Sequence, residues 1–384
     1  MTKCALCGNQ ISNDPADSHC DSAEHIFPNS VGGQKTVSGF ICRKCNSETG
    51  ETWDAALAMT MQPLGLMFGV QRDRGKMPPL RTVTTEGERV TLQAEGGMTL
   101  TNPEFKKTQR TDGSTDYNIK ARSMDEARRI LAGLQKKHPE LDVEATLAQA
   151  TAVEKYLDGD FPFTFQFGGP EAGRSMVKTC LAFAFSNGVG WQECGEATAY
   201  LRDPSAKACF GYFSTHDLIS GRKPGVPLHC VALRADPTTG MVLSYAEYFG
   251  VVRIVACLGE KYAGPRVEAA YAFDPRTGDE FAVQVSLDFD RKTIDDIYAY
   301  QHSDVHAVEA ALASVIGPAL QSQANAERVR VVGRAVDKAF DECGAKEGER
   351  LTEEHVRKIC RSLAESIAPF ALHSMRPVSG PKKS

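Results

Sequence analysis

The stretch from Ala23 to Asn46, AEHIFPNSVGGQKTVSGFICRKCN, decides the fold of the N-terminal part of this chain. It places a Glu-His pair between two Cys-x-x-Cys pairs, Cys4 to Cys7 and Cys42 to Cys45. Two pairs at this spacing are typical of a tetrahedral zinc site in which each pair forms one knuckle. Because four thiolates leave no position open for water or substrate, we predict a structural zinc ion bound by these four cysteines. The alternative is four ordinary buried thiols.

The residues between the two knuckles carry the groups that can do chemistry. Glu24-His25 is followed by Ile-Phe-Pro and then by Gly32-Gly33, and Asn46 directly follows the last cysteine. This order resembles a zinc-containing subgroup of the HNH endonuclease family, written CxxC, EHIxP, GG, CxxCN, with a glycine and an aspartate downstream. The resemblance covers about residues 1 to 58 and rests on Cys4, Cys7, Glu24, His25, Ile26, Pro28, Gly32, Gly33, Cys42, Cys45, Asn46, Gly50 and Asp54.

The resemblance implies a ββα-metal module with His25 as general base and with Glu24 and Asn46 as ligands of a catalytic cation. Elementary chemistry agrees, because phosphodiester hydrolysis needs a base for the attacking water and a hard cation for the phosphate oxygens. Histidine titrates near neutrality, and the oxygen donors of Glu24 and Asn46 suit Mg²⁺ or Mn²⁺. Since adjacent residues on a regular strand face opposite sides, we expect a distorted strand end here, or ligation from one side only.

One departure from the family pattern leaves a second interpretation open. The pattern has an asparagine that orients the histidine about nine residues before the last metal ligand, where this chain has Val37. Thr36, Ser38 or a backbone carbonyl could replace it. His25 could also be a zinc ligand or a packed core histidine. The alternative function is therefore a zinc-stapled nucleic-acid-binding or protein-binding module that has lost catalysis.

Length and composition indicate a globular protein of more than one domain. A chain of 384 residues exceeds one ordinary hydrophobic core, and its 42% hydrophobic and 24% charged residues are typical of soluble proteins. The first residues lack the apolar core of a signal peptide, and no run is long and apolar enough for a membrane span. We therefore expect a cytoplasmic protein without a membrane segment.

The overall charge does not favour binding of nucleic acid by bulk electrostatics, because the net charge is −5 and the pI is near 6.0. Local basic clusters would have to supply that attraction. One candidate cluster contains Arg72, Arg74, Lys76 and Arg81, and the other contains Lys106, Lys107, Arg110, Lys120 and Arg122. Solvated loops are the alternative interpretation of both clusters.

The pattern along the chain predicts an α+β fold with a small zinc-stapled ββα-metal module and a larger mixed domain. We place the module at residues 1–60, a linker at 61–82, an α+β domain or pair of subdomains at 83–374, and a disordered basic tail at 375–384. In the module, Trp53, Leu57 and Met61 share a helical spacing. The larger domain is predicted to contain an antiparallel meander within residues 207–290 and C-terminal helices, the last of them ended by Pro369.

The sequence thus predicts a metal-dependent HNH endonuclease that acts on nucleic acid, with DNA as the expected substrate. The large C-terminal domain would select the substrate, regulate the enzyme, or bind a protein partner or activating ligand. A nuclease module joined to a domain without recognisable chemistry is the pattern of restriction, mobile-element or defence systems, by analogy.

Overall fold

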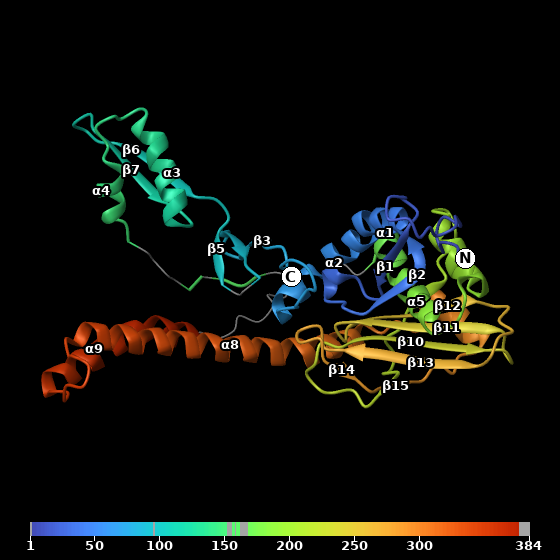
Figure 1. Ribbon diagram of the computed structural model, residues 1–384. Helices are drawn as coiled ribbons and strands as arrows, with labels where there is room; N and C mark the ends of the chain where they lie inside the picture. The colour runs from blue at the N-terminus through green and yellow to red at the C-terminus, as the bar shows by residue number, and fades with distance from the viewer. Residues whose placement is uncertain (1, 95–96, 152–155, 158, 162–167, 376–384) are drawn as a thin grey trace. The chain divides into compact units, whose positions relative to one another are not determined.

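The computed structural model describes residues 2–94, 97–151, 156–157, 159–161 and 168–375 (Figure 1). The chain forms two compact units, each built from two segments. The first contains Met1–Pro78 and Thr164–Leu320, and the second contains Pro79–Phe163 and Gln321–Ser384. This division differs from the expected one, because residues after 163 share a hydrophobic core with the N-terminal module. The proposed linker 61–82 begins inside a helix, and residues 376–384 of the proposed tail lie outside the described residues.

The N-terminal module consists of a two-stranded antiparallel hairpin followed by a long helical segment. The hairpin pairs strands β1 and β2, and its loop contains the short 3-10 helix η1. The helical segment is continuous through a π-helical turn. The elements are β1 (Asp21–His25), η1 (Asn29–Val31), β2 (Thr36–Cys42), α1 (Arg43–Thr49), η2 (Gly50–Asp54) and α2 (Ala55–Phe68). This is the predicted ββα arrangement, and Leu57 and Met61 are buried as their spacing predicted.

Two local features of the hairpin fit the predicted distortion around Glu24-His25. The register of β1 against β2 shifts between Ser22 and Glu24, so the strand is irregular just before the pair. In the loop, a Cβ atom on Gly33 would lie 1.8 Å from the carbonyl oxygen of Phe27, so only glycine fits there. The Gly-Gly motif therefore allows two backbone segments of the loop to approach each other closely.

The first unit contains a six-stranded antiparallel sheet with strand order β14-β13-β10-β11-β12-β8. Strands β10, β11 and β12 form the predicted meander, but β13 pairs with β10 and not with β12. The reason is that β8 already occupies the free edge of β12. The strands are β8 (Phe210–Tyr212), β10 (His229–Asp236), β11 (Met241–Tyr248), β12 (Val252–Gly259), β13 (Val267–Phe273) and β14 (Glu280–Phe281).

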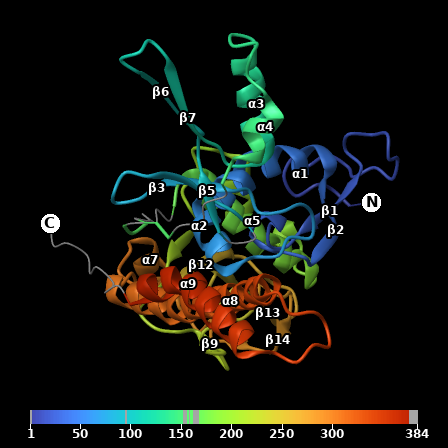
Figure 2. The same ribbon diagram turned by 90° about the vertical axis from the view of Figure 1, so that its left-hand side faces the viewer.

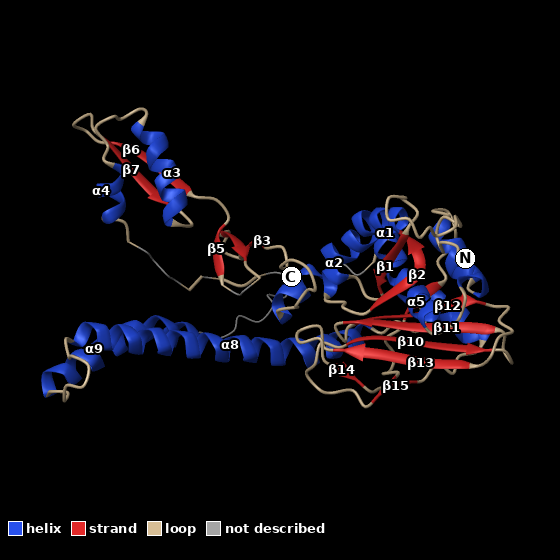
Figure 3. Cartoon of the chain, in the orientation of Figure 1, coloured by secondary structure: helices blue, strands red, loops and turns tan. Residues whose placement is uncertain are grey.

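Helix α5 (Pro170–Ser186) lies between the module and this sheet (Figure 3). It contacts α2, η2 and β2 on one side and β10, β11 and β12 on the other. Every residue from Ala172 to Ala184 is buried, because the helix is covered on both sides. Helix α6 (Gly195–Arg202) follows, and the guanidinium of Arg202 donates to the carbonyl of Ala5 at 2.8 Å, which attaches the first zinc knuckle.

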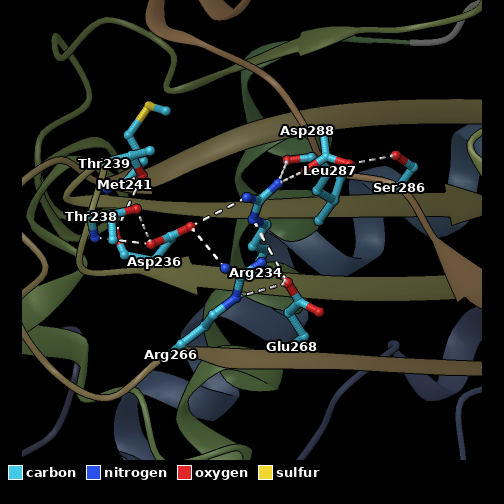
Figure 4. A network of polar contacts seen from close by, with 10 residues as sticks. All are labelled: Arg234, Asp236, Thr238, Thr239, Met241, Arg266, Glu268, Ser286, Leu287 and Asp288. Carbon is cyan, nitrogen blue, oxygen red and sulfur yellow. Dashed lines mark hydrogen bonds and ion pairs between the residues drawn. The ribbon is translucent and has the colours of Figure 1, made fainter.

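The opposite face of the sheet has its own core, covered by helix α7 (Arg291–Tyr298) and by the small pair β9 (Ile219–Ser220) and β15 (Gln284–Val285). A polar network near β10 and β13 joins these covering segments to the sheet (Figure 4). In it, Arg234 contacts Asp288, Glu268 and Asp236. Hydrogen bonds from Thr238 lower the pKa of Asp236 to about 2, so this carboxylate caps the β10–β11 turn as an anion.

His229 connects the module to the sheet through its two ring nitrogens. Nδ1 accepts a hydrogen bond from the backbone N–H of Phe249 at 3.1 Å, so Nε2 carries the proton and donates to the carbonyl of Val31 at 2.9 Å. The ring is fully buried and stacks on Phe27, with centroids 5.2 Å apart. Burial lowers the pKa of His229 to about 4, because a charged ring would lose solvation and the Phe249 hydrogen bond.

This histidine predicts a loss of stability in mild acid. The unfolded chain takes up a proton near pH 6.5 and the folded protein only near 4, so stability is complete above pH 6.5 and falls as the pH drops towards 4. Each pH unit between the two pKa values is worth about 1.4 kcal/mol, so the loss approaches about 3 kcal/mol. Urea unfolding of wild type and His229→Gln at pH 7 and pH 4.5 measures this loss of unfolding free energy. An equal acid loss in the variant, whose side chain does not titrate, would assign the effect to other groups.

The described residues of the second unit form two small antiparallel sheets, two short helices and a helical hairpin. In both views the β6–β7 hairpin lies beside α3, against which Tyr117 and Ile119 pack (Figures 1 and 2). Ser123 caps α3, because its hydroxyl accepts a hydrogen bond from the N–H of Glu126. The elements are β3 (Leu80–Val83), β4 (Arg89–Leu92), β5 (Met98–Leu100), β6 (Glu104–Gln109), β7 (Thr115–Lys120), α3 (Met124–Gln135) and α4 (Val143–Ala148).

The last C-terminal helix is longer than predicted. Helix α8 (Val305–Cys343) is continuous and contributes to both units, and α9 (Glu353–Ser374) continues through Pro369. The expectation that Pro369 ends α9 was wrong, because the following turn is held by Tyr156, whose ring stacks on His373 at 4.4 Å. In the described part of the chain, no helix combines the length and the apolar character that crossing a membrane requires.

Candidate functional site

The four predicted zinc ligands lie together at the open end of the β1–β2 hairpin. The sulfur atoms of Cys4, Cys7, Cys42 and Cys45 all lie within 4.8 Å of one another. Four sulfurs bound to one zinc ion at about 2.3 Å stand about 3.8 Å apart at the corners of a tetrahedron. The Cys7 and Cys42 sulfurs are 3.8 Å apart, and the N–H of Cys42 points at the Cys4 sulfur. The cysteines are therefore positioned to bind a metal, and the all-sulfur donor set indicates structural zinc.

A pocket of about 470 Å³ lies on the same module, beside the hairpin and the helical segment. The three residues predicted to carry the chemistry, Glu24, His25 and Asn46, all line it. Asp54 lines it as well; the family resemblance included this aspartate, but we had not predicted a role for it. The structure thus brings the candidate residues from β1, α1 and η2 to one cavity.

Glu24 and Asp54 are joined by a buried lysine that the sequence analysis missed. The ammonium of Lys178, on α5, lies 2.6 Å from Glu24 Oε1 and 2.7 Å from Asp54 Oδ2. Burial raises the pKa of Glu24, and Lys178 opposes this rise. Burial also disfavours the charged lysine, but the two carboxylates outweigh it and raise the pKa of Lys178. We treat all three groups as charged, because both contacts have the length of charge-assisted hydrogen bonds.

The other oxygen of Asp54 is also engaged, since the hydroxyl of Ser175 donates to Oδ1 at 2.6 Å. The π-helical turn Gly50–Asp54 places Asp54 at this point, and such turns occur frequently at functional sites. On α1, the amide nitrogen of Asn46 donates to Ser22 Oγ at 2.8 Å. This hydrogen bond fixes the orientation of the Asn46 amide, whose oxygen is the atom that suits a hard cation.

His25 lies at the end of β1 with a side chain that is 19% exposed. Its Nε2 atom is buried and makes no hydrogen bond, and Asp73 Oδ2 lies 3.6 Å from it. Burial lowers the pKa of His25, and the Asp73 carboxylate opposes this effect. The imidazole is therefore neutral near pH 7, which is the form that accepts a proton. It is not a zinc ligand, because the cysteine cluster is complete without it.

Asp73 is the second residue that the sequence analysis missed. It follows α2 by five residues and is held by Asn29, whose side-chain oxygen accepts the N–H of Asp73 at 2.8 Å. The expected orienting position, Val37, instead pairs with Glu24 in the hairpin. Asp73 therefore occupies the space beside His25 from another part of the chain.

The donor set of the pocket fits a hard divalent cation. Glu24, Asn46 and Asp54 offer oxygen atoms, and no cysteine is among the residues that line the cavity. Glu24 and Asn46 are the two residues that could hold a Mg²⁺ or Mn²⁺ ion, since both oxygens of Asp54 already accept hydrogen bonds. The unpartnered Nε2 of His25 at the same pocket is consistent with a site that receives a further polar group.

Comparison with known proteins agrees with this geometry. Residues 4–62 match a family model described as HNH endonuclease. The matched segment contains the four cysteines together with Glu24, His25, Asn46 and Asp54, and it ends within α2. The match suggests a nuclease and covers the module but not the six-stranded sheet or the second unit. No curated protein and no solved structure matches the chain.

Proposed function

We propose that this protein is a divalent-cation-dependent endonuclease that hydrolyses phosphodiester bonds in DNA at the pocket of its N-terminal module. The observation that carries the proposal is that Glu24, His25 and Asn46 line one cavity. A base and two oxygen ligands beside one another are the groups that phosphodiester hydrolysis requires. The cysteine cluster would hold the hairpin in shape without taking part in the reaction.

In this mechanism a neutral His25 removes the proton from the attacking water. Glu24 and Asn46 would hold the Mg²⁺ or Mn²⁺ ion, which when bound neutralises charge on the scissile phosphate. The Asp73 carboxylate, 3.6 Å from His25 Nε2, stabilises the imidazolium that forms when the ring takes up the proton.

The test is cleavage of supercoiled plasmid by the full chain with Mg²⁺ or Mn²⁺. We expect nicked or linear products with the cation, and no products after addition of EDTA. Zinc content is measured before and after the chelator, because EDTA could also remove the structural metal. A protein that keeps its zinc, binds plasmid in a mobility shift and leaves it uncut would contradict the proposal.

That last outcome would instead support the alternative, a binding module that has lost catalysis. One observation favours this alternative. Lys178 already neutralises part of the carboxylate charge that would attract a cation. The plasmid assay separates the two functions directly, since only the nuclease changes the plasmid's topology.

The remainder of the chain is proposed to select the substrate or to regulate cleavage, through DNA, a protein partner or an activating ligand. Its basic clusters have less free charge than the sequence suggests. Arg110 pairs with Asp116 and Lys120 with Glu104, each at 2.6 Å, and Arg122 pairs with Glu126. A role in restriction, mobile-element or defence biology, in the cytoplasm, remains a proposal by analogy.

Arg72 is the basic residue best placed to bind a phosphate of the substrate. It lines the pocket, and its buried Nε makes no hydrogen bond while NH1 donates to the carbonyl of Lys76. We predict that Arg72→Ala raises KM for DNA about tenfold with little change in kcat. The slope of the logarithm of the binding constant against the logarithm of the salt concentration should become shallower by the contribution of about one phosphate contact. Cleavage kinetics and binding titrations at several salt concentrations measure both effects.

The control is Lys44→Ala, which removes an exposed positive charge from the same module but not from the pocket. If both variants weaken binding equally, the attraction comes from the charge of the module as a whole. An unchanged KM in Arg72→Ala would show that the substrate backbone does not pass this side of the pocket.

A further inference from the structure

Three oxygen atoms from three elements of the module converge on the Lys178 ammonium. Glu24 Oε1 lies 2.6 Å away, Asp54 Oδ2 lies 2.7 Å away, and Thr49 Oγ1 lies 3.3 Å away. A point surrounded by two carboxylates and a hydroxyl is the environment in which proteins bind hard cations. In this chain a protein cation stands at that point.

The ammonium is a fixed part of the site and not a mobile group. Its three N–H donors have three acceptors, so its hydrogen-bonding capacity is complete. The side chain is 1% exposed, and α5 is buried on both sides of it. Withdrawal of Lys178 would leave two carboxylates buried without a counter-charge, which is strongly unfavourable.

The position of Lys178 relative to the pocket sets its role. Glu24 and Asp54 both line the pocket, whereas Lys178 contacts them from the α5 side and does not line it. A cation held by Glu24 and Asn46 from the pocket side would therefore share Glu24 with the ammonium. This is the arrangement of two-metal sites, in which a carboxylate lies between two cations about 4 Å apart.

We propose that Lys178 takes the place of a second metal ion, so that the site binds one divalent cation where its oxygen atoms could otherwise bind two. This inference rests on the proposed nuclease function. Lys178 is then a positioning residue, because it fixes Glu24 and Asp54 in place. Its positive charge also reduces the negative charge of the site, so that the three groups together carry −1. The residue comes from α5, outside the segment that matches the family, so the module obtains part of its site from the rest of the first unit.

The experiment measures Mn²⁺ binding to the full, zinc-loaded chain without substrate, by titration and electron paramagnetic resonance. We expect one bound Mn²⁺ in wild type and two in Lys178→Ala. The two ions in the variant should give the broadened spectrum of a coupled pair. Lys178→Arg keeps the charge and is expected to bind one. Mn²⁺ should also raise the Tm of Lys178→Ala more than that of wild type, since the metal replaces the missing charge.

The outcomes separate this inference from the proposed function. Wild type without bound Mn²⁺ would contradict the proposed nuclease site. Even then, a gain of one ion in Lys178→Ala would support the inference that Lys178 takes the place of a metal ion. A folded Lys178→Ala protein with the same Mn²⁺ content as wild type would overturn the inference. So would a variant that stays unfolded at millimolar Mn²⁺, because the proposal requires the metal to substitute for the ammonium.

Discussion

Replacing His25 by alanine is expected to lower the rate of DNA cleavage about a hundred-fold or more, the usual contribution of a positioned general base. The fold should be little affected, because Nε2 of His25 makes no hydrogen bond and the side chain lies at the edge of the pocket. Zinc content should also stay unchanged, since the four cysteines form the cluster without it. Single-turnover cleavage of plasmid at saturating Mg²⁺ measures the chemical step apart from DNA binding.

The matched control is His19→Ala. His19 belongs to the same module and bonds Asn9 at 2.9 Å, but it does not line the pocket. We expect this variant to cleave at close to the wild-type rate. If His25→Ala were equally active, the base would lie elsewhere in the site. If both variants lost activity equally, the loss would reflect a change in the structure of the module and not the removal of a general base.

The arrangement of the module could be predicted because the residues that resemble the HNH family lie within one short stretch of sequence. Two knuckles less than 40 residues apart fix the ends of the hairpin, and the Gly-Gly pair fixes its loop. Glu24 and Asn46 stand next to residues whose positions those constraints determine. The resemblance implied that Glu24, His25 and Asn46 act together, and the structure shows that they line one pocket, while their catalytic roles remain predictions.

Lys178 and Asp73 could not be predicted in the same way, because each reaches the site from a distant part of the chain. Lys178 is 154 residues from Glu24 in sequence (178 minus 24) and depends on the packing of α5. One signal was present, since a lysine within the apolar segment MVKTCLAFAF is expected to have a carboxylate partner once the helix is buried. The sequence could not say which carboxylate that would be.

Long-range pairing also explains where the fold predictions differ from the structure. The alternating patterns of β10 to β13 identified strands, but nothing in the sequence of β13 indicates that β8 already pairs with the edge of β12. The two-unit division was likewise hidden, because Phe27 and Phe40 of the module share a core with residues of α5 and β11. Patterns along a chain show which faces are apolar and not which faces meet.

The shared core changes what loss of zinc should do to this protein. Cys4, Cys42 and Cys45 belong to the same buried cluster as residues of α5 and the six-stranded sheet. A zinc module of this size without a shared core would unfold alone, since the folding free energy of so small a unit is largely that of metal binding. With a continuous core, we now expect Cys42→Ser to destabilise the whole first unit by several kcal/mol, a large share of the usual stability of a domain.

Two tryptophans make this measurable, because both belong to the first unit. Trp53 lies in η2 of the module, and Trp191 donates its indole N–H to the carbonyl of Lys3 at 3.1 Å, beside the first knuckle. In Cys42→Ser we expect zinc well below one per chain, and both tryptophans exposed at a lower urea concentration. Cys360→Ser, an exposed cysteine of the second unit, should keep the metal and the wild-type midpoint. A zinc-free Cys42→Ser protein with a wild-type unfolding curve would show that the core, and not the metal, holds the hairpin in place.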